Sequence, residues 1–523
     1  MPKSSCFSSQ LFLIKPLIRL ALSTDSAVLW RLNTHEGSRM PNLLFLYTDE
    51  QRFDTLACMG NDRIDMPNLN RLAERSTVFE RAYCTQPVCT PSRGSIVTGL
   101  HSQAHGATNN NIHMNFDVKC LPEYLPAGEY HCAHMGKWHL GDEIFPQHGF
   151  TEWCGTEDTY HSAYSPPVEE FGPERSPYHH WLLGRGITPD DIVGDLPPEK
   201  RHPAHRNRFF RGQVHALPEE HCKPAFLAER AGEFLHINRQ RPWVLYINFL
   251  EPHPPNTSCR NNQYDPADVT LPYNWDRELN ENQPLRMRLG AAPASERSEQ
   301  SVRERTARYW GMCSLVDTYA GRILDTLEET GQADNTIIVF TTDHGDMLGS
   351  FGRGGKSSMF DESACVPLLI RAPGQQEQRK VACPVSQVDL VPTLLDMMGQ
   401  PVPGELHGAS LRPEAEGAST ATDRDVFIQW GTGPKQDDVP VDLAPHQEGW
   451  CTPEEAGTAR NERVRTIVTP DCWKFSMSSV GDHELYDLNA DPMERSNRYS
   501  DPSQQDRIRE YEQRVEAWQS RVS

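Results

Sequence analysis

Three short runs of apolar residues organise the first part of this chain, at 43–47, 243–249 and 336–340. Each run has the length and composition of a strand that is buried on both faces of a parallel sheet. Acidic or histidine side chains follow each run: Asp49 and Glu50, then His253, then Asp343 and His344. Because the carboxyl ends of strands in a doubly wound sheet lie along one edge, we expect these side chains to converge.

The pattern changes at about residue 402. Before it, a further apolar run at 366–370 and helical periodicity at 309–329 and 388–398 continue an α/β arrangement. After it, separated strands and a terminal helix stand among loops rich in Gly, Glu and Asp; the predicted elements are 427–430, 464–468, 473–477 and 506–521. We therefore predict a large domain at 40–401 and a small α+β subdomain at 402–523.

Residues 1–39 form a separate N-terminal extension. Lys15, Pro16 and Arg19 interrupt its apolar stretch, which a secretory signal would keep continuous. We interpret Met40 as the true start and 1–39 as disordered or untranslated, with a poor signal peptide as the alternative. The first interpretation indicates a cytoplasmic protein and the second a periplasmic or secreted one.

The composition narrows the class of partner. A formal net charge of -21 argues against nucleic acid, which needs a basic footprint on its partner. The 14 cysteines are scattered singly, unlike a zinc ribbon or a dense disulfide framework. No stretch approaches the length of a transmembrane span. The run at 200–211 contains no acid, and it is either a solvated basic loop or a lip that recognises a substrate with several negative charges.

Residues 89–93 read Cys-Thr-Pro-Ser-Arg. Alone, this pattern is also typical of a buried cysteine before a helix, since proline is common in a first helical turn. Pro91 and Ser92 predict the start of an amphipathic helix, so Cys89 would lie where free backbone N–H groups attract anions. Arg93 adds a guanidinium suited to an oxyanion one turn later. The segment thus predicts a reactive atom beside an anion site.

A second candidate pair is Lys137 and His139, in a segment bracketed by Gly136 and Gly141. If this segment is extended, the i, i+2 spacing places both side chains on one side and Trp138 on the other. A lone Lys-x-His is usually a solvated loop. The bracketing glycines and the tryptophan favour a fixed backbone that aims both side chains at one place.

Taken together, these motifs resemble type I sulfatases, of the alkaline phosphatase superfamily. The segments that carry the resemblance are 89–93, 98–99, 136–139, 252–254, 343–345, 355–356 and 484–492. The resemblance extends from about residue 40 to the end. It implies an α/β fold with a large central mixed β-sheet flanked by helices, followed by the smaller C-terminal α+β subdomain.

The resemblance also implies a catalytic apparatus. A maturation enzyme would oxidise Cys89 to formylglycine (3-oxoalanine), whose hydrate attacks sulfur with one hydroxyl and expels sulfate with the other. Asp49, Asp343 and the formylglycine would hold a divalent cation, usually calcium. The remaining roles are these: Arg93 holds the formylglycine hydroxyl, Lys137 and Lys356 bind sulfate oxygens, His139 breaks down the sulfated intermediate, and His253 with Lys356 protonates the leaving alcohol.

Two departures from the family pattern leave alternatives open. Sulfatases commonly have Asp-Asp and Asp-Asn where this chain has Asp49-Glu50 and Asp343-His344. A histidine ligand makes Mn²⁺ conceivable beside Ca²⁺ or Mg²⁺, and Glu50 either joins the metal or points elsewhere. Asp-His also occurs in choline-sulfatase-like and phosphonate monoester hydrolase branches, and Asn110 lies where the latter places a substrate-binding Asn.

Our leading hypothesis is a formylglycine-dependent sulfatase acting on a carbohydrate sulfate or a small alkyl or aryl sulfate. The 200–211 run and the large inserts favour a sulfated sugar over choline sulfate. The alternatives are a choline-sulfatase-like enzyme, a phosphonate monoester or phosphodiester hydrolase, and a non-catalytic binder of sulfated glycans. Against the phosphonate alternative, that branch replaces the Lys-x-His pair, which is intact here. The sequence leaves the oligomeric state open.

Overall fold

The strands that precede the candidate site residues are neighbours in one sheet. In the computed structural model, β1 (Asn42–Thr48) lies between β5 (Trp243–Asn248) and β6 (Thr336–Thr342) and runs parallel to both. On its other side β5 pairs, again in parallel, with β3 (His131–Gly136). The carboxyl ends of these four strands therefore meet at one edge of the sheet, as the strand-end pattern predicts.

The structure describes residues 40–156, 176–187, 217–419, 422–433 and 442–522. The predictions for the extension at 1–39 and for the basic run at 200–211 lie outside these residues. Across the described ranges, none of the helices combines the length and the apolar character that crossing a bilayer requires.

The chain from Pro41 onward forms one compact unit that contains two sheets. Besides β1, β3, β5 and β6, its strands are β2 (Thr77–Tyr83), β4 (Glu152–Gly155), β7 (Cys365–Arg371), β8 (Arg379–Val381), β9 (Val385–Ser386), β10 (Val426–Trp430), β11 (Val464–Val468), β12 (Trp473–Ser478) and β13 (Glu484–Asp487). Its described α-helices are α2 (Pro67–Ala73), α3 (Cys89–Thr98), α4 (Ser102–His105), α5 (Leu121–Tyr124), α7 (Pro177–Leu183), α8 (Lys223–Asn238), α9 (Leu285–Leu289), α10 (Glu299–Glu329), α11 (Asp361–Ala364), α12 (Leu390–Met397), α13 (Arg412–Ala415), α14 (Pro453–Arg460) and α15 (Gln505–Val522).

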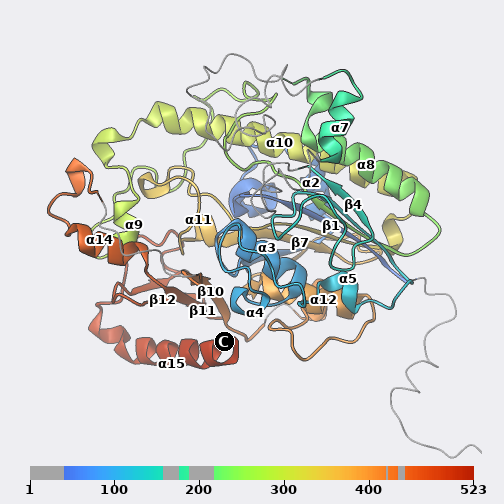
Figure 1. Cartoon of the computed structure of the whole chain (residues 1–523). Coiled ribbons are helices and arrows are strands. Elements are labelled where there is room, and N and C mark those ends of the chain that lie inside the picture. Colours follow the sequence, from blue (N-terminus) through green and yellow to red (C-terminus); the bar gives the residue numbers. More distant parts are fainter. Residues whose placement is uncertain (1–39, 157–175, 188–216, 420–421, 434–441, 523) are drawn as a thin grey trace, which may run out of the picture. The chain divides into compact units, whose positions relative to one another are not determined.

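The first sheet is nine-stranded and mixed, in the order β4-β3-β5-β1-β6-β7-β2-β8 with β9 beside β2. Strand β7 runs antiparallel to both β6 and β2. The second sheet is four-stranded and antiparallel, in the order β10-β11-β12-β13. The predicted fold class, a central mixed sheet flanked by helices with a smaller C-terminal α+β part, is confirmed (Figure 1).

Helices cover both faces of the large sheet (Figure 1). On one face, Leu44 and Leu46 of β1 share a buried core with side chains of α2, α8 and α10. Because strand side chains alternate, Tyr47 points to the opposite face, where the Arg93 guanidinium of α3 lies 5.0 Å from its ring centre. Helix α3 thus reaches the sheet edge from this second face.

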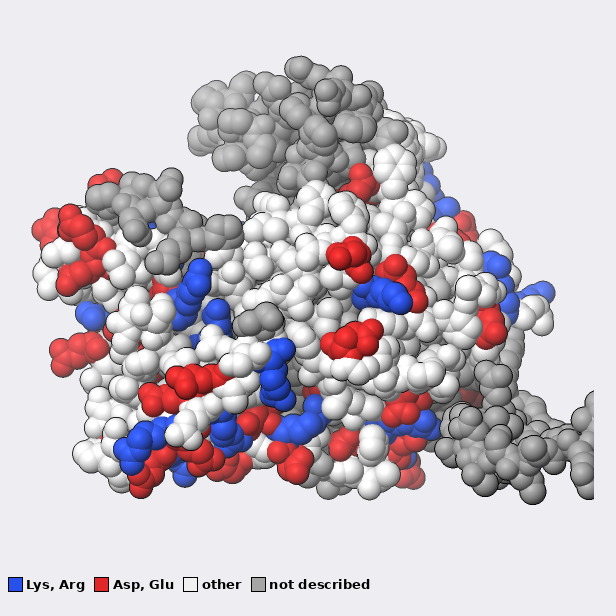
Figure 2. All heavy atoms as spheres, turned by 60° about the horizontal axis from the view of Figure 1, so that its bottom comes forward, with Lys and Arg blue, Asp and Glu red and all other residues white. Residues whose placement is uncertain are grey.

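The second sheet packs its own helix, α15. Phe427 of β10 stacks on Trp518 of α15 with ring centres 4.7 Å apart, and Phe475 and Val515 complete this core. On the face turned forward in Figure 2, acidic and basic side chains are interspersed. Lys474 of β12 is buried and binds Asp361 and Glu494 at 2.7 and 2.8 Å, and the first of these pairs links the second sheet to helix α11. The boundary at 401/402 stays a prediction.

Two helices differ from the sequence expectation. Helix α10 begins at Glu299, ten residues before the apolar periodicity. The periodicity misses its first turns because they are rich in charged residues. Ser298 caps these turns, and an Arg303–Glu299 ion pair at 2.7 Å stabilises them. The predicted amphipathic character of α3 is wrong, since all ten of its residues are buried. Its polar side chains are bonded inside the protein, as when Ser92 donates to the Asp343 carbonyl at 2.5 Å.

Candidate active site

Arg93 joins the ends of three strands. It is fully buried and donates from Nη2 to Asp49 Oδ2 and from Nε to Asp343 Oδ2, both at 2.8 Å. Its Nη1 donates to the Lys137 carbonyl at 2.9 Å. Burial alone would lower the pKa of Arg93, but Asp343 and Asp49 hold it well above its usual value. The guanidinium therefore fixes both carboxylates in place. Asp49 Oδ1 is left facing residue 89, and Asp343 Oδ1 accepts the backbone N–H groups of Glu50 and His344.

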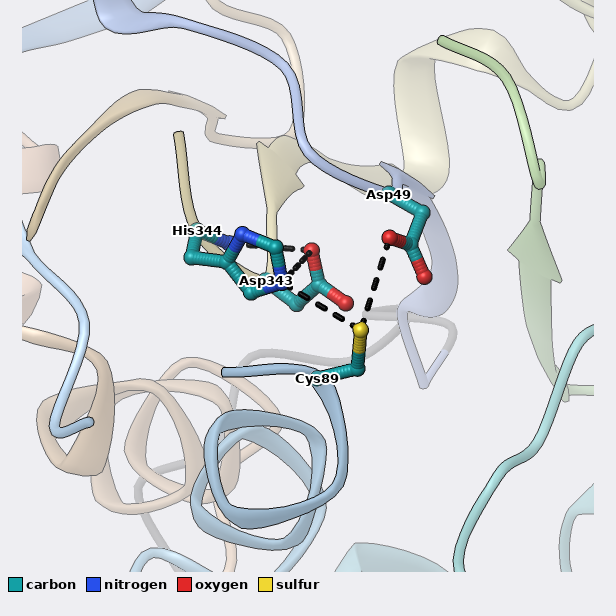
Figure 3. A group of neighbouring side chains, drawn as sticks. All are labelled: Asp49, Cys89, Asp343 and His344. Atoms are coloured by element: carbon teal, nitrogen blue, oxygen red, sulfur yellow. Dashed lines mark hydrogen bonds and ion pairs between the residues drawn. The ribbon is translucent and has the colours of Figure 1, made fainter. Parts of the chain in front are cut away.

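Cys89 is the first residue of α3 and is 1% exposed, and its thiol lies among these groups (Figure 3). Its Sγ is 3.7 Å from Asp49 Oδ1, 3.3 Å from His344 Nε2 and 3.0 Å from Lys356 Nζ. Burial and then Asp49 raise the pKa of the thiol, although Lys137 and Lys356 oppose this. The thiol is thus not poised as a thiolate nucleophile.

The donors around Cys89 fit a divalent cation. Single ligand atoms of Asp49, Cys89, Asp343 and His344 all lie within 4.8 Å of one another. His344 Nδ1 lies 3.0 Å from the Gly345 carbonyl and donates to it, so Nε2 keeps its lone pair and faces Asp343 Oδ1 at 3.6 Å. Two carboxylate oxygens and one imidazole nitrogen are a suitable donor set for Ca²⁺ or Mn²⁺.

Glu50 lies next to Asp49 but outside the group of potential ligand atoms around Cys89. It belongs to a second group of potential ligand atoms, with Asp49 and His253. Its Oε2 binds Lys356 Nζ at 2.8 Å and lies 3.5 Å from His253 Nε2. A positive φ of 66° turns the chain at this residue, and its backbone N–H donates to Asp343 Oδ1 at 3.0 Å. Whether Glu50 is a metal ligand stays a prediction.

Lys137 comes directly after β3 and is completely buried. Its Nζ donates to Asp49 Oδ2 at 2.6 Å. Burial alone would raise the pKa of Asp49, but Lys137, His253 and Arg93 hold it well below its usual value, so the carboxylate is ionised. Gly136 is required at the strand end, since a Cβ there would lie 2.0 Å from the Asn248 carbonyl oxygen.

The segment after Lys137 is not extended as the spacing suggested, because His139 has a φ of 61°. Buried Glu143 holds this turn by accepting the backbone N–H groups of Trp138 and His139. His139 Nε2 then faces Asn111 Oδ1 at 3.0 Å. Burial, followed by Lys137, lowers the pKa of His139 well below its usual value, so its imidazole is neutral.

A loop at 108–111 connects His139 with residue 89. Asn110 Oδ1 accepts the Thr90 backbone N–H at 3.0 Å, and the Asn111 backbone N–H lies 3.4 Å from the Thr90 hydroxyl. Asn110 therefore caps the first turn of α3 in this structure. Its predicted role in binding substrate stays a prediction.

His253 and Lys356 are the last two predicted residues of the candidate active site. His253 Nδ1 donates to the Pro254 carbonyl at 2.6 Å, which leaves Nε2 directed at Glu50 and at Asp49 Oδ1, 3.9 Å away. Burial and then Lys356 lower the pKa of His253. For Lys356, burial opposes the charge, but Cys89, Glu50 and Asp49 raise its pKa well above its usual value. Lys356 is therefore cationic beside a neutral imidazole.

The structure brings every predicted site residue into this network, but it adds three that the sequence analysis missed. Asn111 contacts His139, Glu143 holds the 138–139 turn, and Asn248 donates to the Lys137 carbonyl at 3.0 Å. Only Asn248 carried a usable signal, because an amide that ends an apolar strand run is unusual. Asn111 and Glu143 act through loop contacts that no local pattern reveals.

The Asn111 contact leads to a testable expectation. Asn111→Ala removes the acceptor for His139 Nε2, so we expect kcat to fall roughly tenfold to a hundredfold. Asn111→Asp keeps an acceptor oxygen and should retain most of the activity. Asn489→Ala, another exposed asparagine far from this network in the sequence, is the control. Steady-state kinetics on an aryl sulfate would contradict the role of Asn111 if the Ala variant matched the control.

Comparisons with known proteins show the family and the fold of this chain. The family model described as "Sulfatase" matches residues 41–400. The N-acetylglucosamine-6-O-sulfatase of Bacteroides thetaiotaomicron is 27% identical over 504 residues, which cover 88% of this chain and 83% of that protein. The choline-sulfatase of Rhizobium meliloti is 26% identical over 480 residues, which cover 88% of this chain and 83% of that protein. The solved phosphonate monoester hydrolase SpPMH of Silicibacter pomeroyi shares the fold, with a TM-score of 0.70 at 24% identity over 92% of this chain and 96% of that one.

Proposed function

This chain belongs to the sulfatase family and is a sulfuric ester hydrolase, and we propose that it cleaves the sulfate ester of a carbohydrate or an aryl alcohol at residue 89. The observation that carries the proposal is the set of groups around Cys89 Sγ: Asp49, His344 and Lys356 all lie within 3.7 Å. Family relatives named for an aminosugar sulfate and for aryl sulfates support this choice of substrate.

Residue 89 would act as formylglycine formed from Cys89 by a maturation enzyme. The family supports this, and the raised pKa of the buried thiol argues against its direct use. The hydrated aldehyde would supply one hydroxyl to attack sulfur and a second to release sulfate. Arg93 and Lys137 both donate to Oδ2 of Asp49, which directly follows β1. The carboxylate held in this way would fix the position of residue 89.

Asp49, Asp343, His344 and residue 89 would hold a divalent cation, Ca²⁺ in most sulfatases, with Mn²⁺ or Mg²⁺ as alternatives. A bound cation would neutralise sulfate oxygens and lower the pKa of the attacking hydroxyl. Arg93 would hold both carboxylates in position for this cation, because its single guanidinium contacts Asp49 and Asp343, each at 2.8 Å. His344 contributes a nitrogen donor whose tautomer is set by the Gly345 carbonyl.

The remaining side chains bind the anion and move protons. Lys137 and Lys356 place two ammonium groups beside residue 89, where they would hold sulfate oxygens. His253 would give its Nε2 proton to the leaving alcohol, since an anionic ester beside it favours the protonated imidazole. His139 is neutral and would accept a proton during sulfate release.

His344 offers a direct test of the cation site. Metal-stripped protein should gain thermal stability on addition of Ca²⁺ or Mn²⁺, by about 2.7 kcal/mol at a hundredfold excess over Kd. In His344→Ala this gain should shrink at the same cation concentration, because one donor is lost. The exposed His236→Ala is the control. An unchanged stabilisation in His344→Ala, measured by calorimetry, would contradict the assignment of this residue.

The function itself is tested by turnover of matched esters. We expect release of sulfate from a panel of sulfated monosaccharides and 4-nitrophenyl sulfate, with the best sugar exceeding choline sulfate in kcat/KM. Activity confined to choline sulfate would overturn the carbohydrate or aryl assignment. Faster cleavage of a phosphonate monoester or phosphodiester than of every sulfate would instead favour the runner-up.

A further inference from the structure

A polar cavity of about 70 Å³ lies between the large sheet's loops and the C-terminal part of the chain. On one side its wall is formed by Gln86, Thr108 and Asn109, and on the other by residues 430–433 and 460–463. Thr432 Oγ1 donates to Gln86 Oε1 or to the Thr108 carbonyl, each 2.8 Å away. These contacts fix the two walls against each other, so the cavity is preformed.

The cavity adjoins the proposed active site. Gln86 is three residues from Cys89, a separation of at most about 11 Å even in fully extended chain. Asn109 directly precedes Asn110 and Asn111, which contact Thr90 and His139. One short loop therefore forms both a wall of the cavity and part of the surroundings of residue 89.

The cavity offers positive charge. Arg460 and Arg463 line it with exposed side chains, and neither forms an ion pair with any residue that the structure describes. The one acid in the lining, Glu462, is buried and already binds Arg286 Nε at 2.9 Å and the Ser478 hydroxyl. In a chain with a formal net charge of -21, two arginines without acidic partners form a local site for an anion.

We propose that this cavity is a substrate subsite for a second anionic group, a sulfate or a carboxylate, on the saccharide whose sulfate ester is cleaved at residue 89. A water molecule needs about 15 Å³ of such space, so 70 Å³ accommodates one small anionic substituent but not a further sugar ring. Guanidinium forks match the oxygens of both anions. The inference rests on the proposed function and specifies its substrate class: a saccharide with at least two negative charges.

The test compares Arg460→Ala/Arg463→Ala with the unaltered protein on graded substrates. These are 4-nitrophenyl sulfate, a monosulfated monosaccharide, its disulfated counterpart, and a sulfated disaccharide that contains a uronate. We expect kcat/KM to fall roughly tenfold to a hundredfold only for substrates with a second anion. Loss confined to the disulfated sugar or to the uronate identifies which anion the cavity accepts. Arg509→Ala, on the exposed face of α15, is the control.

Equal loss on all four substrates, or loss on none, overturns the subsite. A second measurement does not depend on turnover: calorimetric binding of the mono- and disulfated monosaccharides to Cys89→Ala protein, with and without the two arginine substitutions. The disulfated sugar should bind more tightly, and the double substitution should abolish the difference. If the two sugars bind equally, the subsite is wrong even where the enzyme is active; if the unaltered protein hydrolyses no sulfate, the proposed function fails on its own.

Discussion

Cys89→Ala should lower sulfate ester turnover by roughly four orders of magnitude or more, because it removes the atom that the remaining site surrounds. Asp49, His344 and Lys356 approach the Cys89 side chain within 3.7 Å, and none of them can replace an attacking hydroxyl. Cys89→Ser should be equally poor in multiple turnover. A serine can attack sulfur, but it lacks the second hydroxyl that expels sulfate, so it should release about one alcohol per active site and stop.

Cys84→Ala is the matched control, since it removes another buried thiol five residues earlier without altering the groups around residue 89. Its turnover should stay within a few-fold of the unaltered protein. Rapid-mixing kinetics on an aryl sulfate would separate the alcohol burst of Cys89→Ser from its steady state. Sustained turnover by either Cys89 variant would remove residue 89 from the reaction.

Arg93→Ala should affect both stability and activity. The Arg93, Asp49 and Asp343 side chains are all 0% exposed, so removing the guanidinium leaves two buried carboxylates without their shared partner. Breaking a buried ion pair in this way costs about 3–5 kcal/mol. Both carboxylates would also lose the positions in which Arg93 holds them at the proposed active site, so activity should fall with stability.

Denaturant unfolding compared with a surface pair tests this expectation. Arg71→Ala breaks a pair with Asp325 whose side chains are 42% and 50% exposed, and it should cost at most about 1 kcal/mol. Arg93→Lys restores one positive charge but not the fork, so it should recover part of the stability and little activity. A loss in Arg93→Ala no larger than that in Arg71→Ala would refute the bridging role.

The strands that were predicted in the large sheet share one property: they are short apolar runs. Strands β1, β5 and β6 are buried along their whole length, and their final residues place Asp49, His253 and Asp343 at one edge. Strand β2 escaped prediction because Glu80 and Arg81 interrupt it where its register with β7 shifts. Strand β3 escaped because His131 and His134 break its apolar pattern, although His134 is fully buried.

The sequence predicted the side chains that would take part in the reaction, but not the contacts that hold those side chains in place. Cys89, Lys137 and Lys356 stand in motifs whose residue types are chemically uncommon together. The function of Arg93 as a bridge between β1 and β6 could not be read from the sequence, since its partners are 44 and 250 residues away. Asn111 and Glu143 were missed for the same reason: their contacts depend on how loops fold back on the site.

The most direct measurement is peptide mass spectrometry of the segment containing residue 89, from protein isolated from its natural host. Our proposal predicts the mass of an aldehyde in place of the Cys89 thiol, in a fraction of molecules that scales with sulfatase activity. An unmodified thiol in fully active enzyme would contradict the central claim, that Cys89 is a precursor of the nucleophile and not the nucleophile itself.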